Sequence, residues 1–283
     1  MSGTSGKMTA NADFERFQTG AAEYAAYLET AEGRLRLDLA FANLQEFLPQ
    51  PARSLRALDL GGGTGASAVR LARIGLHVTL LDVSQPMLDL AKCAAREAGV
   101  TDRIVLKHGD AAQPEALFAP GSFDVILCHN ILEYVEDPCA VLRSAARALR
   151  NPSSLLSILV RNQAGEVLKA AIQDGDLAAT EHNLTAEWGH ESLYGGEVRL
   201  FTTESLQAML LGSSLAVTAE RGVRVISDYL PPSVSRNNQY KRILELERKL
   251  GRRPEFAAVA RYTHFLAHPP GPITGSPAMQ DGA

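Results

Sequence analysis

The sequence predicts an α/β fold with a doubly wound, mostly parallel sheet. Short apolar runs typical of buried strands alternate with helical patterns between residues 55 and 160. The segments between these runs are short, as in proteins whose helices cross from one parallel strand to the next. A glycine-rich turn at residues 61–65 directly follows the first apolar run. In such sheets this first turn is where a nucleotide binds.

The elements follow one another in a regular order. Helical periodicity covers residues 21–48, and prolines at positions 49 and 51 end it. Strands are predicted at 55–60, 77–82, 103–107, 123–128 and 154–160, with helices at 66–74, from 85, and at 138–149. Beyond residue 200 we expect a helix at 202–211, an extended segment at 215–226, an amphipathic helix at 240–250 and a last strand at 261–267. The two late extended segments bring the sheet to seven strands.

One domain accounts for most of the 283 residues. We assign it to residues 13–267, with N-terminal helices at 13–50. Residues 162–200 break the strand–helix rhythm after the fifth strand, and we interpret them as a lid-like insertion. The segments 1–12 and 268–283 are rich in small and polar residues or in Pro and Gly, and we interpret them as disordered tails.

Composition excludes several classes of protein. The net charge of −4 argues against a uniformly basic nucleic-acid binder. No apolar run approaches the roughly 18 residues of a membrane-spanning helix, and the N-terminus lacks the apolar centre of a signal peptide. The three cysteines do not have metal-ligand spacing, so we expect reduced thiols, a cytoplasmic protein and no metal site. The oligomeric state cannot be predicted.

The first turn has glycines at positions 61, 62 and 63, which let the backbone approach a ligand. The spacing Gly61-x-Gly63-x-x-Ala66 also satisfies the dinucleotide pattern. However, Asp59 stands two residues before the first glycine, and its carboxylate would repel a pyrophosphate. The same carboxylate would attract the cationic methionyl part of S-adenosylmethionine (SAM). The residues therefore favour SAM over a dinucleotide.

Two further acids match the remaining parts of SAM. Asp82 ends the second strand, where a carboxylate accepts hydrogen bonds from the two ribose hydroxyls. Asp110 follows the third strand, in a position suited to the adenine amino group. The strand that begins at Phe123 and Asp124 then ends beside the sulfonium. From residue 55 to residue 160, this series of features resembles the class I SAM-dependent methyltransferases. The resemblance implies a Rossmann-like, seven-stranded fold and SAM as cofactor.

A narrower resemblance extends over residues 32–267. It is carried by the blocks EGRLR, HNILEYVEDP, GVRVISDYL, LELE and ARYTH, which begin at residues 32, 129, 222, 244 and 260. These blocks resemble the bacterial tRNA methyltransferases that esterify 5-carboxymethoxyuridine at the wobble position. The resemblance implies tRNA as the partner and a carboxylate as the methyl acceptor.

The same resemblance implies roles for individual residues. Arg36 would pair with the methionyl carboxylate, as the two-pronged guanidinium suits. Gly61 and Gly62 would line the turn, and Asp82 would hold the ribose. Ala111 and Ala112 would border the adenine, and His129 would lie beside the cofactor at the end of the fourth strand.

The residues that act on the acceptor depend on its chemistry. A carboxylate is already nucleophilic and needs only a cation to orient it, for which Arg161, Arg224 and Arg261 are candidates. A hydroxyl or amine acceptor would need a base, and His129, His182 or His190 could serve. Tyr194, Tyr229 and Trp188 could cap the pocket or stack on a uridine, although packing explains each of them as well.

Three other functions remain open. The 162–200 insertion is acidic, with glutamates at 181, 187, 191 and 197, and would repel phosphates. This favours a small-molecule methyltransferase of secondary metabolism. The cofactor motifs also fit an enzyme that cyclises SAM itself and releases methylthioadenosine, and a non-catalytic SAM-binding subunit. By contrast, basic residues outnumber acids in 234–262, which could contact an anticodon stem.

Overall fold

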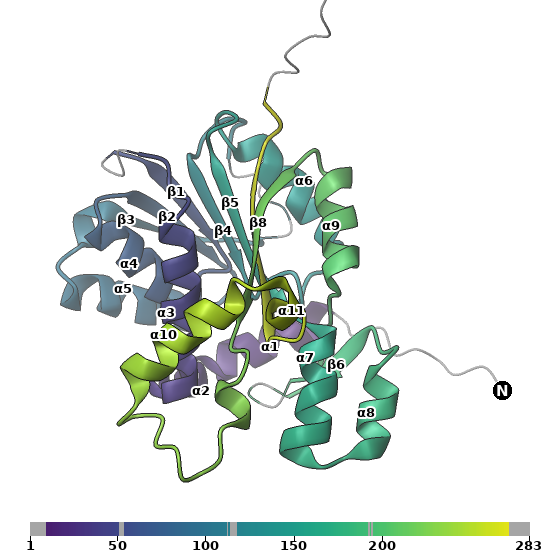
Figure 1. The fold of residues 1–283 in the computed structure, drawn as a ribbon. Coiled ribbons are helices and arrows are strands. Elements are labelled where there is room, and N and C mark those ends of the chain that lie inside the picture. Colours follow the sequence, from purple (N-terminus) through teal and green to yellow (C-terminus); the bar gives the residue numbers. More distant parts are fainter. Residues whose placement is uncertain are drawn as a thin grey trace, which may run out of the picture.

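Seven strands form one central sheet, and helices cover both of its faces (Figure 1). The structure is a computed structural model, and it describes residues 10–50, 54–111, 113, 118–191, 193 and 195–271. The strand order is β3-β2-β1-β4-β5-β9-β8. The strands are β1 (Arg56–Leu60), β2 (His77–Asp82), β3 (Ile104–His108), β4 (Val125–His129), β5 (Leu155–Arg161), β8 (Ala216–Val223) and β9 (Tyr262–His268).

The predicted mostly parallel, seven-stranded sheet is confirmed. Strands β1 to β5 pair in parallel, and β9 runs antiparallel between β5 and β8. Each strand begins within two residues of its predicted start. The order reverses between β1 and β4, because the chain passes from β3 across to the other side of β1. Ligands of open α/β sheets bind at this reversal, outside the carboxyl ends of the strands.

Alternation along the strands divides the core between the two faces. Leu58 and Ile126 pack with α6 (Pro138–Ala148) and α9 (Thr203–Gly212) in one cluster. Their neighbours Ala57 and Val125 pack on the opposite face, against α4 (Ala66–Arg73) and α5 (Gln85–Glu97). This is the period of two expected of strands buried on both faces.

The N-terminal region is three helices rather than one long helix. They are α1 (Ala10–Thr19), α2 (Ala21–Glu29) and α3 (Ala31–Gln45). The predicted helix over 21–48 is broken at Thr30, which is extended and whose hydroxyl accepts a hydrogen bond from the Gly33 amide at 3.0 Å. A Cβ on Gly33 would lie 2.1 Å from the Tyr27 carbonyl oxygen, so only glycine permits this sharp turn. Helix α1 begins inside the segment predicted as a tail.

The 162–200 insertion folds next to the carboxyl ends of β4 and β5. It contains α7 (Gln163–Leu168), a π-helical turn η3 (Lys169–Asp174), α8 (Leu177–Asn183) and a hairpin of β6 (Trp188–His190) and β7 (Glu197–Arg199). The Arg199 amide donates to the Glu133 carbonyl, which follows β4, at 3.1 Å. Within the described ranges, no helix has the length and apolar character needed to cross a membrane.

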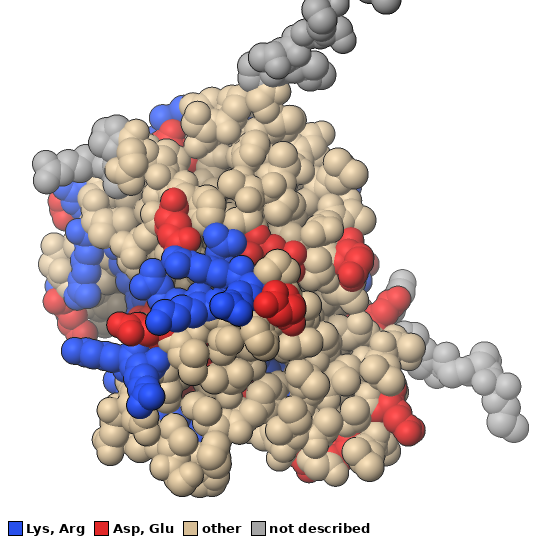
Figure 2. Space-filling model, viewed as in Figure 1, with Lys and Arg blue, Asp and Glu red and all other residues tan. Residues whose placement is uncertain are grey.

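Helix α10 (Tyr240–Gly251) holds the turn that follows β8. The predicted extended segment 215–226 ends earlier, at Val223, because Arg224 adopts a φ of 61° and turns the chain. The fully buried Glu247 carboxylate then accepts three amide hydrogen bonds from Val225, Ile226 and Ser227, at 2.6, 3.0 and 2.7 Å. The outer face of α10 is basic, and Figure 2 shows Lys and Arg side chains gathered over it. Helix α11 (Pro254–Ala257) leads back to β9.

Replacing Glu247 by Ala should lower the free energy of unfolding by about 3 kcal/mol, because three buried amides lose a charged acceptor. Urea denaturation measures this loss. Replacing Glu245, which is exposed on the same helix, is the matched control and should change stability by less than about 0.5 kcal/mol. Equal effects of the two substitutions would contradict the structural role of Glu247.

Candidate functional site

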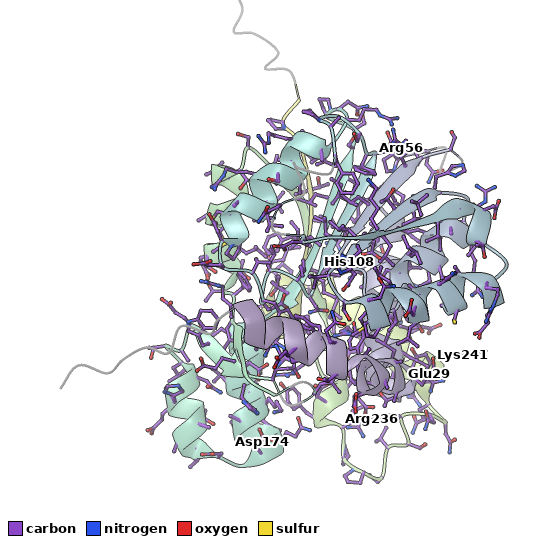
Figure 3. The ribbon with its side chains drawn as sticks, turned by 180° about the vertical axis from the view of Figure 1, so that it is seen from behind. Glu29, Arg56, His108, Asp174, Arg236 and Lys241 are labelled. Carbon is purple, nitrogen blue, oxygen red and sulfur yellow. The ribbon has the colours of Figure 1, made fainter. Side chains whose placement is uncertain are left out.

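A cavity of about 840 Å³ lies at the reversal of strand order. Figure 3 helps to locate it, since Arg56 marks the start of β1 at one end of the sheet and Asp174 lies in the insertion at the other end. The cavity collects residues from the carboxyl ends of the strands, from the N-terminal helices and from the insertion. Of the predicted site residues, those that line it are Arg36, Gly61, Gly63, Asp82, Asp110, Ala111, His129, Arg161, His190, Arg224 and Arg261.

The remaining predicted residues are distributed differently. Asp59 and Gly62 line a small adjoining pocket of about 40 Å³, which shares Arg36 and His129 with the main cavity. Ala112 and Tyr194 lie outside the described residues. His182, Trp188 and Tyr229 are not among the residues that line either cavity. No group of three or more potential metal ligands occurs in the described part of the chain.

The glycines of the first turn are required by close packing. Gly61 has a φ of +62°, and a Cβ there would lie 2.8 Å from the Ile131 side chain. A Cβ on Gly62 would lie 2.5 Å from Leu80. Larger residues would therefore push the turn away from β2 and from the loop after β4, and the turn would lose its contact with the cavity.

Asp82 is held at the edge of the cavity by backbone amides. One carboxylate oxygen accepts from the Gly63 amide and the other from the Ser84 amide, both at 2.8 Å. The side chain is almost completely buried, and burial raises its pKa. Each oxygen keeps a second lone pair, so the carboxylate can accept from two neighbouring hydroxyls at once. This arrangement suits the ribose role predicted for Asp82.

Asp59 is a buried acid with unused hydrogen-bonding capacity. It is 2% exposed, and its Oδ2 atom has no hydrogen-bond partner among the described residues. Burial, together with the nearby Asp82 carboxylate, raises the pKa of Asp59 to about 7. A cation bound in this corner would favour the charged carboxylate. The ammonium group of a methionyl moiety is such a cation.

Arg36 is the complementary feature, a buried cation with no carboxylate within ion-pair distance among the described residues. Tyrosines 24, 27 and 262 surround its guanidinium, with ring centroids 5.7, 5.1 and 5.6 Å away. Its Nη2 donates to the Tyr24 hydroxyl at 2.9 Å. These tyrosines were not among the predicted site residues. The three-residue spacing of the first two, which places them on one helix face, is the signal that could have indicated them.

The other three cavity arginines are already paired. Arg161 contacts Glu166 at 3.2 Å and also binds Glu191. Arg261 bridges Glu166 and Asp228, at 3.1 and 3.3 Å. Arg224 pairs with both oxygens of Asp228, at 2.8 and 2.6 Å. Glu166 and Glu191 were not predicted as site residues. All three acids neutralise the arginines, so an anionic acceptor has to compete with them for a guanidinium.

His129 lies between the two pockets, and its Nε2 is 2.8 Å from the Ser157 hydroxyl. Burial and the positive charge of Arg36 lower its pKa to about 3. The imidazole is therefore neutral near pH 7. It is also a weak base, because a low pKa means that the ring binds a proton weakly. The structure thus argues against the role of general base that was considered for His129.

Comparisons with known proteins agree with this geometry. Residues 58–156 match the family model described as a methyltransferase domain. The tRNA 5-carboxymethoxyuridine methyltransferase of Escherichia coli K12 is 31% identical over 249 residues, covering 85% of this chain and 90% of the relative. The chain belongs to the SAM-dependent methyltransferase family. This methyltransferase therefore takes SAM as cofactor, and the unpaired Asp59 oxygen and Arg36 cation fit the two charges of its methionyl end.

Two further proteins match less of the methyltransferase or share only its fold. The ubiquinone biosynthesis O-methyltransferase of Xanthomonas euvesicatoria pv. vesicatoria is 36% identical over 115 residues, 40% of this chain and 46% of the relative. Magnesium protoporphyrin IX methyltransferase from Synechocystis PCC 6803, solved with bound S-adenosylhomocysteine, has a TM-score of 0.61 at 13% identity. It covers 92% of this chain and 99% of that protein, which establishes the shared fold.

The elevated pKa of Asp59 predicts how stability depends on pH. Because the pKa is higher in the folded than in the unfolded state, the folded protein binds more protons between about pH 4 and pH 7. The free energy of unfolding should therefore fall as pH rises through this range, by up to a few kcal/mol. Urea denaturation across the range measures this slope.

The Asp59→Asn variant should lose this part of the pH dependence and be more stable than wild type at about pH 8. Asp102→Asn, at an exposed acid, is the control and should keep the wild-type slope. An identical slope in Asp59→Asn and wild type would show that Asp59 does not titrate in this range.

Proposed function

We propose that this methyltransferase transfers a methyl group from SAM to the carboxylate of 5-carboxymethoxyuridine at the wobble position of tRNA. The observation that supports this acceptor is the extent of the match to the E. coli tRNA enzyme. That match spans 85% of the chain, far beyond the 58–156 methyltransferase domain, whereas the ubiquinone O-methyltransferases match 40–47%. The regions outside the domain supply Arg36, Arg224 and Tyr262 to the cavity.

The cavity residues support in-line methyl transfer. We expect Asp82 to hold the ribose, Asp59 the ammonium and Arg36 the carboxylate of the cofactor. The bound cofactor supplies a methyl group activated by a positively charged sulfur. A carboxylate acceptor needs no base, which agrees with the weak basicity of His129. Catalysis then depends on alignment of the carboxylate with the methyl carbon in a site shielded from water.

The acceptor carboxylate requires a cation to orient it. Because Arg161, Arg224 and Arg261 are already paired, we expect this carboxylate to displace the acidic side chain that binds one of them. All three paired arginines line the cavity, and Arg161 is the best placed because its partner Glu191 both lines the cavity and lies in the insertion. Glu191 also contacts the Tyr134 hydroxyl at 3.4 Å. Displacement of Glu191 by substrate would leave Arg161 and Tyr134 to hold the incoming carboxylate.

The basic face of α10 supports a polyanionic substrate. Lys241, Arg242 and Lys249 are exposed on the helix, and Arg252 and Arg253 are exposed directly after it. Glu245 is the exposed acid within the helix (Figure 2). Phosphate contacts of this kind position a nucleic acid without reading its sequence. A cytoplasmic location, where tRNA is found, would follow from this function.

The proposed acceptor is tested by incubating the protein with SAM and one of three additions, and analysing the products by mass spectrometry. With tRNA that carries 5-carboxymethoxyuridine, we expect one methyl ester for each S-adenosylhomocysteine released. With the same tRNA lacking the modification, and with SAM alone, we expect no turnover.

The SAM-only arm is needed because the fold alone does not determine the reaction. A solved structure described as a [4+2]-cyclase, SpnF, shares the fold at a TM-score of 0.55 and 19% identity. Methylthioadenosine formed from SAM alone would indicate an enzyme that cyclises SAM itself instead of transferring its methyl group. Absence of turnover on the modified tRNA, with turnover on a phenolic or small acidic acceptor, would indicate a small-molecule methyltransferase.

Charge reversal on α10 tests the proposed tRNA surface. The double variant Arg242→Glu with Lys249→Glu should raise the KM for tRNA about tenfold or more at low salt, because two phosphate contacts become repulsive. Its affinity for S-adenosylhomocysteine, measured by calorimetry, should not change. Lys92→Glu with Arg96→Glu, on the exposed face of α5, is the matched control. If both double variants have the same effect on KM, α10 is not the docking surface.

A further inference from the structure

A buried chain of hydrogen bonds leads from the cavity into the core. The Ser157 hydroxyl lies 2.8 Å from His129 Nε2 and 2.8 Å from His264 Nε2. The other ring nitrogen of His264, Nδ1, is 3.4 Å from Asn43 Nδ2. Ser157, His264 and Asn43 are 0%, 0% and 3% exposed, so water cannot compete for these bonds. Of its four side chains, only His129 lines the cavity, and Ser157, His264 and Asn43 lie behind it.

Strand register explains why these residues meet. His129 at the end of β4, Leu159 on β5 and His264 on β9 are directly paired across the sheet. Ser157 is two residues before Leu159 and therefore projects from the same face. Helix α3 covers this face, since Leu35 and Leu39 pack on Leu159, and it brings Asn43 to His264. The histidine rings meet edge to face, with centroids 5.4 Å apart.

The Asn43 amide determines which atom donates and which accepts in each hydrogen bond of this series. The amide nitrogen of Asn43 can only donate, so Nδ1 of His264 accepts. A neutral imidazole carries one N–H, and His264 must then donate from Nε2 to the Ser157 oxygen. The Ser157 oxygen accepts this hydrogen bond, and the Ser157 hydroxyl in turn donates a hydrogen bond to Nε2 of His129. The one N–H of His129 is consequently on Nδ1.

Both histidines are neutral, so each ring carries a single N–H. Burial lowers the pKa of His264 well below its ordinary value, as it does for His129. Nδ1 of His129 has no hydrogen-bond partner among the described residues, and the side chain lines the same two pockets as Arg36. This N–H is therefore available to an oxygen bound beside the Arg36 guanidinium.

We propose that Asn43, His264 and Ser157 are positioning residues that fix His129 in the Nδ1–H tautomer, so that it donates a hydrogen bond to the carboxylate of the bound cofactor. Without these hydrogen bonds, His129 would revert to the Nε2–H form that free histidine prefers. Its Nδ1 atom would then present a lone pair to that carboxylate. The hydrogen bonds from Asn43, His264 and Ser157 thus convert His129 from a residue that would repel the carboxylate into one that binds it.

Long-range ¹H–¹⁵N correlation spectra of histidine-labelled protein test this proposal without any acceptor, so its outcome is independent of the proposed tRNA function. The His129 and His264 signals are assigned from His129→Gln and His264→Gln variants. Near neutral pH we expect protonated Nδ1 in His129 and protonated Nε2 in His264. The opposite tautomer in His129 would overturn the proposal.

Two variants interrupt this series of hydrogen bonds. In Ser157→Ala, and in Asn43→Ala, the population of Nδ1–H His129 should fall, and the affinity for S-adenosylhomocysteine in calorimetry should drop about tenfold. Ser154→Ala is the matched control, because Ser154 is also buried, directly before β5, and its hydroxyl accepts from the Asn151 amide rather than joining the hydrogen-bond chain. A thermal unfolding curve establishes that each variant is folded. An unchanged tautomer in a folded Ser157→Ala variant would contradict the proposal.

Discussion

The buried guanidinium of Arg36 lacks a carboxylate partner in the described structure, and the site is organised around that unpaired charge. A cation in this position is costly unless an anion joins it. Three tyrosine rings reduce the cost, but they do not remove it. Nearby, Asp59 is a buried acid with one unpartnered oxygen and an elevated pKa. A zwitterion that places its carboxylate on Arg36 and its ammonium on Asp59 satisfies both charges together. Two incompletely paired charges of the protein itself, Arg36 and Asp59, would then select a ligand with a methionyl end.

The same physical constraint explains why His129 is a donor rather than a base. An imidazolium beside Arg36 would add a second buried positive charge, so the ring remains neutral and its only variable is the position of one proton. Donors from α3 and β9 determine that position through Ser157. The chemistry of the proposed acceptor agrees with this arrangement, since a carboxylate has no proton to lose.

Sequence reasoning predicted the sheet and the cofactor end of the cavity because both depend on local patterns. Asp59, the glycines and Asp82 all lie at strand ends within 24 residues of one another, from 59 to 82, and their chemistry can be inferred from that position. The tyrosines around Arg36 come from α2 and β9, which are more than 200 residues apart in sequence, and only the fold brings them together. The break at Thr30 was missed for a different reason: the apolar pattern continues through it, and a single capping hydroxyl decides where the helix ends.

The apparent conflict between the acidic insertion and an anionic substrate depends on where the acids point. Along the sequence, acids outnumber basic residues in the insertion, but Glu166 and Glu191 are 7% and 5% exposed and neutralise arginines inside the cavity. They contribute little to the potential that an approaching phosphate meets. Glu181, Glu187 and Glu197 are exposed on the insertion, whereas the basic side chains of 234–262 are concentrated on α10, which packs on α3 and β8. The inward-facing glutamates therefore offset arginines of the cavity, and the exposed positive charge of residues 234–262 lies on a separate surface at α10.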